Sequence, residues 1–437
     1  MEISRVILML LAIVCVLVIG GVGQVYSMDG QLDTKAELVD GTAIKSELEF
    51  TDNVNLPLIN IEIKGKEYKF LLDTGSTFTV IDKNLVKELE QIGSLDNEDA
   101  AEQKKAQGPM VAKLDSFKLG DIEFENVGVR ILNLSHFREY GLNIKGIVGA
   151  NILQFLELTI DYQNEKILFS QESQFNFSRE KGYKLQLAPE SKWSDAKLDR
   201  PNRPTIEVVF GGATVPTLVD TGYSGFVSIE SALVHQNEKM FKKVLVKELK
   251  GGSTIGVHGQ KSLTLFGKDE MGGGLFKFPA IQIGEMKFKD FPVDLVSGDG
   301  TMVIGSDFLN EFEKVVINYL EKEIFFIGDR KNIDKTQSSC GFKVGKNEVG
   351  EVIVNGYWKG SPAEKANLEI GDKILKATGK GAQEVILTNF SLVELGNKLL
   401  LNEEYEVLEL LIEKKTGEKR KVTLEKENLM DSDNGEY

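Results

Sequence analysis

Two aspartates stand in the same local sequence at two places in this 437-residue chain. Asp73 lies in Phe-Leu-Leu-Asp-Thr-Gly-Ser, and Asp220 lies in Thr-Leu-Val-Asp-Thr-Gly-Tyr. One Asp-Thr-Gly is a common strand-to-turn sequence, whereas two copies in matching contexts can bring two carboxyl groups together. Carboxyl groups about 3 Å apart cannot both ionise, so such a pair shares a proton and offers an acid and a base at one place. The glycine after each threonine allows the tight turn that lets the two carboxyls face each other.

The sequence around each aspartate is part of a longer unit that occurs twice. Alternating apolar residues, which are typical of strands, precede both motifs, and further matches follow in the same order. The matched segments are 58–63 with 206–210, 117–124 with 281–288, 147–149 with 303–305, and 158–169 with 315–326. The two aspartates are 147 residues apart, and the later glycines, Gly149 and Gly305, are 156 apart. Agreement of this many features in one order indicates an internal repeat.

These repeats resemble the retropepsin-like and pepsin-like aspartic peptidases over roughly residues 55–328. In that family an apolar-apolar-Gly segment crosses beneath the Asp loop, and Ile-Val-Gly and Val-Ile-Gly match it here. The resemblance implies a mainly β, two-lobed fold with pseudo-twofold repeats, with lobes at 45–172 and 173–330. It also implies that Asp73 and Asp220 are the catalytic pair that holds the attacking water. Protein or peptide substrates are expected, with no metal or organic cofactor.

The resemblance extends to the neighbours of the two aspartates. Thr74 and Thr221 are expected to form a buried hydrogen-bonded pair that joins the lobes. In pepsin-like members a hydroxyl after Asp-Thr-Gly can bond the outer carboxylate oxygen; Ser76 fits this pattern, whereas Tyr223 does not, although Ser224 is adjacent. A carboxylate that lacks such a donor has a higher pKa, so we expect a weakly acidic or neutral pH optimum. The supporting residues implied in this way are Thr74, Gly75, Ser76, Thr221, Gly222 and Ser224.

Family members close a β-hairpin flap over the substrate. Two segments are candidates, Gln107-Gly-Pro-Met110 and the glycine-rich run from Gly251 to Gly256. Each of them also fits an ordinary surface loop.

A different pattern begins after a polar stretch at 328–339. Residues 360–375 resemble the core of bacterial PDZ domains, so we expect an α+β PDZ-like domain at 336–428. In such domains a peptide adds a strand beside the domain's edge strand, and backbone amides receive its terminal carboxylate. Here Cys340, Gly341 and Phe342 align with that carboxylate loop, and a predicted helix at 390–400 forms the other wall.

The groove of this domain has two interpretations. It binds a C-terminal peptide, or it is packed against the rest of the chain and unused. Both repeats are complete in sequence before Gly328, so we expect the two-lobed unit to fold without residues 339–437.

The N-terminus predicts export. Arg5 precedes an almost unbroken apolar run at 6–22, which is typical of a secretory signal or a membrane anchor. The run is long enough to span a bilayer if it is not cleaved. We therefore expect residues 1–27 to be a signal peptide or anchor, and the protein to be periplasmic, otherwise extracytoplasmic, or membrane-anchored. Residues 31–49 fit either a short pro-region or a linker.

Composition excludes several classes of function. A net charge of −15 argues against nucleic-acid binding, which needs clustered Lys and Arg. The three histidines, His136, His235 and His258, are not at metal-ligand spacing, so no metal site is expected. Only Cys340 remains once the N-terminal run with Cys15 is removed, so no internal disulfide is expected.

Two other functions fit the same sequence. One is a non-catalytic peptide-binding or scaffolding protein on the same fold. The other is a membrane-anchored PDZ adaptor in which the repeats are a spacer.

Overall fold

The computed structural model describes most of the chain between residues 36 and 429. The described residues are 36–50, 56–91, 95–96, 110–140, 142–188, 202–210, 213–223, 225–230, 245–251, 271–289, 291–296, 302–328, 338–347, 349–380, 384–385, 387, 395 and 405–429. The apolar run at 6–22 lies outside them. Within them, no helix combines the length and the apolar character needed to cross a membrane.

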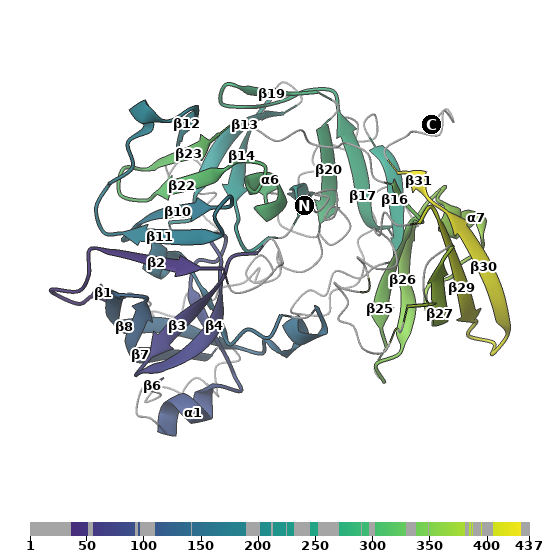
Figure 1. The fold of residues 1–437 in the computed structure, drawn as a ribbon, viewed down its shortest axis with the longest axis horizontal. Coiled ribbons are helices and arrows are strands. Elements are labelled where there is room, and N and C mark those ends of the chain that lie inside the picture. Colours follow the sequence, from purple (N-terminus) through teal and green to yellow (C-terminus); the bar gives the residue numbers. More distant parts are fainter. Residues whose placement is uncertain are drawn as a thin grey trace, which may run out of the picture.

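The fold is mainly β, as the sequence predicts. Strands make up most of the described structure, and the helices are short (Figure 1). The α-helices with full bounds are α1 (Val86–Gln91), α3 (Ala150–Leu153), α6 (Ser306–Leu309) and α7 (Pro362–Lys365), and two 3-10 helices, η1 (Ser135–Tyr140) and η2 (Phe177–Arg179), accompany them.

The first lobe is built on an eight-stranded sheet with the order β1-β8-β5-β9-β4-β3-β7-β6. Its strands are β1 (Glu37–Leu38), β3 (Leu58–Ile63), β4 (Lys66–Leu72), β5 (Thr79–Asp82), β6 (Leu95–Asp96), β7 (Met110–Leu119), β8 (Ile122–Leu132) and β9 (Gly146–Val148). The β3–β4 hairpin turns at Lys64 and Gly65, which have φ values of 47° and 76°. Strand β4 then runs parallel to β9, with Leu72 opposite Val148.

The second lobe repeats this arrangement. Its strands are β13 (Thr205–Phe210), β14 (Ala213–Val219), β15 (Val227–Glu230), β17 (Met271–Phe278), β18 (Ile281–Ile283), β19 (Met286–Phe288), β20 (Phe291–Val296) and β21 (Met302–Ile304). Strand β14 runs parallel to β21, with Val219 opposite Ile304. In both lobes, therefore, the strand before Asp-Thr-Gly lies beside the strand that ends in apolar-apolar-Gly.

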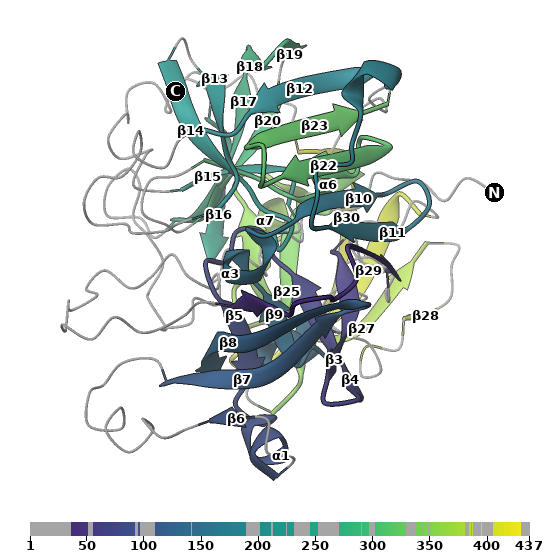
Figure 2. The same cartoon turned by 90° about the vertical axis from the view of Figure 1, so that its left-hand side faces the viewer.

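A six-stranded sheet joins the lobes, in the order β12-β23-β22-β10-β11-β2. Its strands are β2 (Lys45–Glu49), β10 (Glu157–Asp161), β11 (Lys166–Ser170), β12 (Gly182–Gln186), β22 (Lys314–Asn318) and β23 (Glu323–Ile327). Equivalent strands of the two repeats, β10 and β22, pair antiparallel at its centre. Figure 2 shows this sheet between the strands of the first lobe and those of the second.

The segment before the first repeat is part of these sheets. Strand β1 pairs with β8, and β2 pairs with β11 across Glu47 and Leu168. The expectation of a linker is therefore wrong for these strands, because their backbone is paired with the first lobe.

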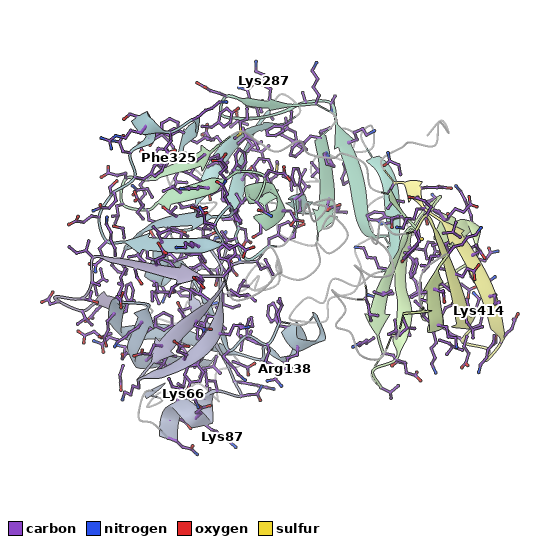
Figure 3. The ribbon with its side chains drawn as sticks, viewed as in Figure 1. Lys66, Lys87, Arg138, Lys287, Phe325 and Lys414 are labelled. Carbon is purple, nitrogen blue, oxygen red and sulfur yellow. The ribbon has the colours of Figure 1, made fainter. Side chains whose placement is uncertain are left out.

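The C-terminal unit contains β25 (Phe342–Lys346), β26 (Val352–Trp358), β27 (Lys373–Gly379), β29 (Val407–Glu413) and β30 (Lys419–Glu425), with α7 between β26 and β27. Ser361 caps α7, and Glu364 of its first turn accepts a hydrogen bond from the amide of Gly360 at 2.7 Å. In the Gly-Asp turn, the buried carboxylate of Asp372 pairs with Lys414 at 3.1 Å; Figure 3 labels Lys414. Of the predicted helix at 390–400, only Leu395 is described.

The C-terminal unit is continuous with both lobes. Strand β16 (Leu245–Gly251) pairs with β17 of the second lobe on one edge and with β26 on the other, so one sheet crosses the boundary (Figure 1). A hydrophobic cluster also crosses it, from Leu58 and Phe137 in the first lobe to Phe342 and Leu410 in the C-terminal unit.

Two opposite charges also act on each other at this boundary. Asp294 of β20 has 6% of its surface exposed, and Lys343 of β25 is its charged neighbour. Burial raises the pKa of Asp294 to about 7 against the opposing effect of Lys343, and burial lowers the pKa of Lys343 to about 8.

Candidate active site

Each aspartate directly follows the last residue of a strand, and the two strands are equivalent in the two repeats. The amide of Asp73 donates to the carbonyl of Val148 at 3.0 Å, and the amide of Asp220 donates to the carbonyl of Ile304 at 2.9 Å. The parallel strand pair beneath each loop therefore fixes where its aspartate emerges.

The apolar-apolar-Gly elements lie against the backs of the loops. A Cβ atom on Gly149 would stand 2.4 Å from the backbone of Phe78, and one on Gly305 would stand 2.2 Å from the carbonyl oxygen of Gly225. The residues that follow complete the contact, since Ala150 donates to Ser76 and Ser306 donates to Tyr223, at 2.8 and 2.7 Å. Glycine is required at both crossings because any side chain would separate the strands from the loops.

The two Asp-Thr-Gly loops face each other. A Cβ atom on Gly75 would lie 2.3 Å from Oδ2 of Asp220, and one on Gly222 would lie 2.4 Å from Cγ of Asp73. Each glycine is thus in contact with the carboxyl of the opposite loop. Asp73 and Asp220 expose only 2% and 5% of their surfaces. The structure brings together the two carboxyls that the repeat pairs in sequence.

Backbone amides hold both carboxylates in orientation. The amide of Ser76 donates to Oδ1 of Asp73 at 2.9 Å, and the amides of Gly222 and Tyr223 donate to Oδ1 of Asp220 at 2.8 and 3.1 Å. The side-chain hydroxyl of Ser76 donates instead to the carbonyl of Phe78 at 2.7 Å. The expected hydroxyl bond from Ser76 to the carboxylate is therefore wrong, and Ser224 lies outside the described residues.

The electrostatics of the pair favour a shared proton. Burial raises the pKa of Asp73 well above its ordinary value, and the negative charge of Asp220 and a hydrogen bond to it raise it further. Burial also raises the pKa of Asp220, but the hydrogen bond from Asp73, the amide of Gly222 and the charge of Arg203 all lower it. One carboxyl is therefore protonated at a pH where the other is ionised.

Thr74 and Thr221 join the loops crosswise. The hydroxyl of Thr74 donates to the carbonyl of Val219 at 2.6 Å, and that of Thr221 donates to the carbonyl of Leu72 at 2.7 Å. Each hydroxyl also accepts the amide of the other threonine, at 3.0 and 3.1 Å. Both side chains are fully buried, so the four hydrogen bonds fix the two loops relative to each other.

Comparison with known proteins bears on the first lobe. Residues 59–152, which include Asp73 and its loop, match the family model described as aspartyl protease. The chain has an aspartic protease-like fold. No curated protein matches it.

Two solved structures are similar to this aspartic protease-like chain. A retropepsin-like aspartic protease from Rickettsia conorii is 18% identical over 31% of this chain and 92% of its own, with a TM-score of 0.21. Basic 7S globulin from soybean is 10% identical over 67% of this chain and 95% of its own, with a TM-score of 0.36.

One residue beside the two carboxyls was missed in the sequence. Arg203 donates from Nη1 to the carbonyl of Gly75 at 3.3 Å, and its charge acts on Asp220. The signal was present, because Arg203-Pro204 stands in the second repeat where Leu56-Pro57 stands in the first. An alignment of the two repeats that includes the residues before their first strands reveals this difference.

The predicted carboxylate loop of the C-terminal unit is largely occupied by its own chain. The amide of Gly341 donates to the hydroxyl of Ser339 at 3.1 Å, and the carbonyl of Gly341 accepts from Trp358 at 2.8 Å. Cys340 and Phe342 are fully buried, and burial raises the pKa of the Cys340 thiol to about 12, so this thiol is no nucleophile at neutral pH. Among the described strands, β25 pairs with β26 alone.

Both flap candidates fall largely outside the described residues. Of the first, only Met110 is described, at the start of β7, and of the second, only Gly251, at the end of β16.

Proposed function

We propose that the protein is an aspartic endopeptidase, in which Asp73 and Asp220 activate a water to hydrolyse peptide bonds. The observation that carries this is the contact of each loop glycine with the opposite carboxyl, by which two buried carboxyls of raised pKa lie side by side. The match of residues 59–152 to an aspartyl protease family supports it.

The reaction follows from one ionised and one protonated carboxyl. The carboxylate takes a proton from water as the water oxygen bonds to the peptide carbonyl carbon, and the carboxylic acid gives its proton to the carbonyl oxygen. The product of this step is a neutral gem-diol. The proton taken from water then passes to the amide nitrogen as the C–N bond breaks. A gem-diol hydroxyl returns its proton to the other carboxylate as the carbonyl re-forms, so the starting state of the pair is restored.

The loops also exclude competing arrangements of the pair. The threonine cross-links and the amides on each Oδ1 fix the carboxyls before substrate binds, and such preorganisation removes reorganisation from the reaction barrier. No metal or organic cofactor is needed in this scheme.

The C-terminal unit is proposed to bind an extended segment of a substrate or partner along β25. This rests on the pairing of β25 with β26 alone among the described strands, which offers backbone groups for strand addition. The hydrogen bonds within the Gly341 loop weaken the case for capture of a terminal carboxylate there. The apolar run at 6–22 supports a place outside the cytoplasm, secreted or anchored.

Digestion of a denatured protein and of a mixed peptide library, with and without a hydroxyl-containing transition-state mimic, tests the peptidase proposal. Cleavage that the mimic suppresses and that Asp73→Asn lacks supports it. Binding of library peptides without cleavage by the intact protein would instead favour a non-catalytic peptide-binding protein on the same fold.

A further inference from the structure

The two repeats place different residues at one equivalent position beside the carboxyl pair. The carbonyl of Pro57 accepts the amide of Leu72 at 2.9 Å, and the carbonyl of Pro204 accepts the amide of Val219 at 2.8 Å. The backbones before the two strands are therefore held in the same way. The residue preceding the proline is Leu56 in the first lobe and Arg203 in the second. A buried apolar side chain on one side corresponds to a cation on the other.

The cation reaches across to the opposite loop. Nη1 of Arg203 donates to the carbonyl of Gly75 at 3.3 Å, and Gly75 is itself the residue in contact with the Asp220 carboxyl. The preceding residue, Asn202, donates to the side chain of Gln154 in the first lobe at 2.6 Å, which holds this segment against that lobe. The guanidinium therefore occupies a fixed place next to one end of the pair.

We propose that Arg203 is a positioning residue that keeps the negative charge of the pair on Asp220 and the shared proton on Asp73. This rests on the proposed peptidase function. A nearby cation stabilises an ionised carboxyl, and nothing of that kind stands at the equivalent Leu56. The charge of Arg203 lowers the pKa of Asp220, whereas the charge of Asp220 raises that of Asp73. In the reaction, Asp220 then takes the proton from water and Asp73 protonates the carbonyl oxygen.

Two phenols face the pair among the described residues, and both stay neutral while it titrates. Tyr319 and Tyr223 are buried beside it, and burial and nearby negative charges raise the pKa of both phenols above the ordinary value. The negative charges of Asp294 and Asp307 contribute to the raised pKa of Tyr223.

The pH dependence of kcat/KM tests the assignment. Replacement of Arg203 by Leu copies the first lobe, and the acidic limb, which reports ionisation of Asp220, should move up by about one pH unit because an opposite charge is lost. The alkaline limb, which reports Asp73, should move less. The pH range over which kcat/KM is high should therefore become narrower. Arg203→Lys should keep the acidic limb in place. Arg179→Leu, at an exposed arginine of η2, is the matched control.

A direct titration separates this inference from the peptidase proposal. In protein labelled with carbon-13 at the aspartate carboxyls, with Asp73→Asn and Asp220→Asn for assignment, Asp220 should ionise at lower pH than Asp73. In Arg203→Leu, or in Arg203→Gln if the leucine variant does not fold, the pH values at which Asp220 and Asp73 ionise should lie closer together. Unchanged ionisation of both groups in a folded, neutral variant would overturn the role of Arg203. A wild type that cleaves nothing, yet shows the expected titration, would instead remove the peptidase proposal and leave the charge assignment standing.

Discussion

Thr74 and Thr221 each accept the other's backbone amide, at 3.0 and 3.1 Å, across two repeats that are 147 residues apart. Their hydroxyls also donate to carbonyls of the opposite repeat. The relation is reciprocal, so neither loop can shift without breaking hydrogen bonds of the other. The spacing of the two carboxyls therefore depends on this pair.

Replacement of Thr221 by Val should lower the free energy of unfolding by about 2–4 kcal/mol, because it leaves a buried carbonyl and a buried amide unpaired. Thr221→Ser, which keeps the hydroxyl, should cost less. Urea unfolding of both variants measures the difference. Equal stability of the Val and Ser variants would mean that the crosswise bonds contribute nothing to the lobe contact.

Asp73→Asn and Asp220→Asn should each abolish peptide hydrolysis almost completely, because the reaction needs both carboxyls. The double variant should be little worse than either single one, as for residues that act as a unit. Folding should survive, since asparagine is nearly isosteric and removes one of two repelling charges. Steady-state kinetics beside circular dichroism checks both points, and full activity of either folded single variant would contradict the mechanism.

The pH optimum of the wild type should lie in the weakly acidic to neutral range. The reason differs from that offered by the sequence, since Ser76 gives its hydroxyl to Phe78 and so the first carboxylate also lacks that donor. Burial of both carboxyls is the leading cause of their raised pKa values. A bell-shaped profile of kcat/KM that peaks at strongly acidic pH would be inconsistent with this burial.

Local patterns predicted the elements around the site well. The alternation at 58–63 matches β3 in both bounds, and the two apolar-apolar-Gly segments lie in β9 and β21 with their glycines at the loops. These features depend on strand periodicity and on backbone crossings that only glycine permits, and both leave a direct mark on the sequence.

Features set by tertiary contacts were not predicted. The segment Leu-Val-Lys-Glu-Leu-Lys-Gly of β16 does not indicate that one of its edges pairs with β26, more than 100 residues later in the chain. Likewise, the direction of the Ser76 hydroxyl depends on where the chain places the carbonyl of Phe78. Arg203 was overlooked because its importance arises from its contact with the opposite repeat.

Deletion of residues 339–437 should destabilise the two lobes, contrary to the expectation from the repeats alone. It would leave the outer edge of β16 unpaired and uncover apolar side chains such as Phe137 of the first lobe. We expect the melting temperature to fall by more than about 5 °C, in line with a loss of a few kcal/mol in a chain of this size. Removal of residues 430–437 alone is the control. An unchanged melting temperature after the large deletion would show that the C-terminal unit is a separate domain.

The Asp294–Lys343 pair should make stability depend on pH. Because the folded pKa of Asp294 is about 7 and its ordinary value is 3.8, its contribution is complete below pH 4 and is lost as the pH rises through 7. The double variant Asp294→Asn/Lys343→Met should therefore lose less stability than the wild type between pH 4 and 7.

The single variant Asp294→Asn gives a second test of this pair. It leaves the ammonium of Lys343 without its counter-charge and should be less stable than the double variant at pH 7. Because Lys343 is only partly buried by surface area, the difference should fall below the roughly 3–5 kcal/mol typical of fully buried pairs. Thermal unfolding from pH 4 to 7 measures the stability of all three proteins. Equal pH dependence of stability in the wild type and the double variant would contradict the role of this pair.

The pairing of β2 with β11 limits how the N-terminus can be trimmed during maturation. A proteolytic cut beyond Glu49 would remove β2, the edge strand next to β11, from the sheet that joins the lobes. It would expose the N–H and C=O groups of residues 166–170. An uncovered edge of that kind invites strands from other molecules and favours aggregation. A protease that removes the leading segment without this consequence must therefore cut on the N-terminal side of Lys45, and it must cut before Glu37 if β1 is also to stay in its sheet.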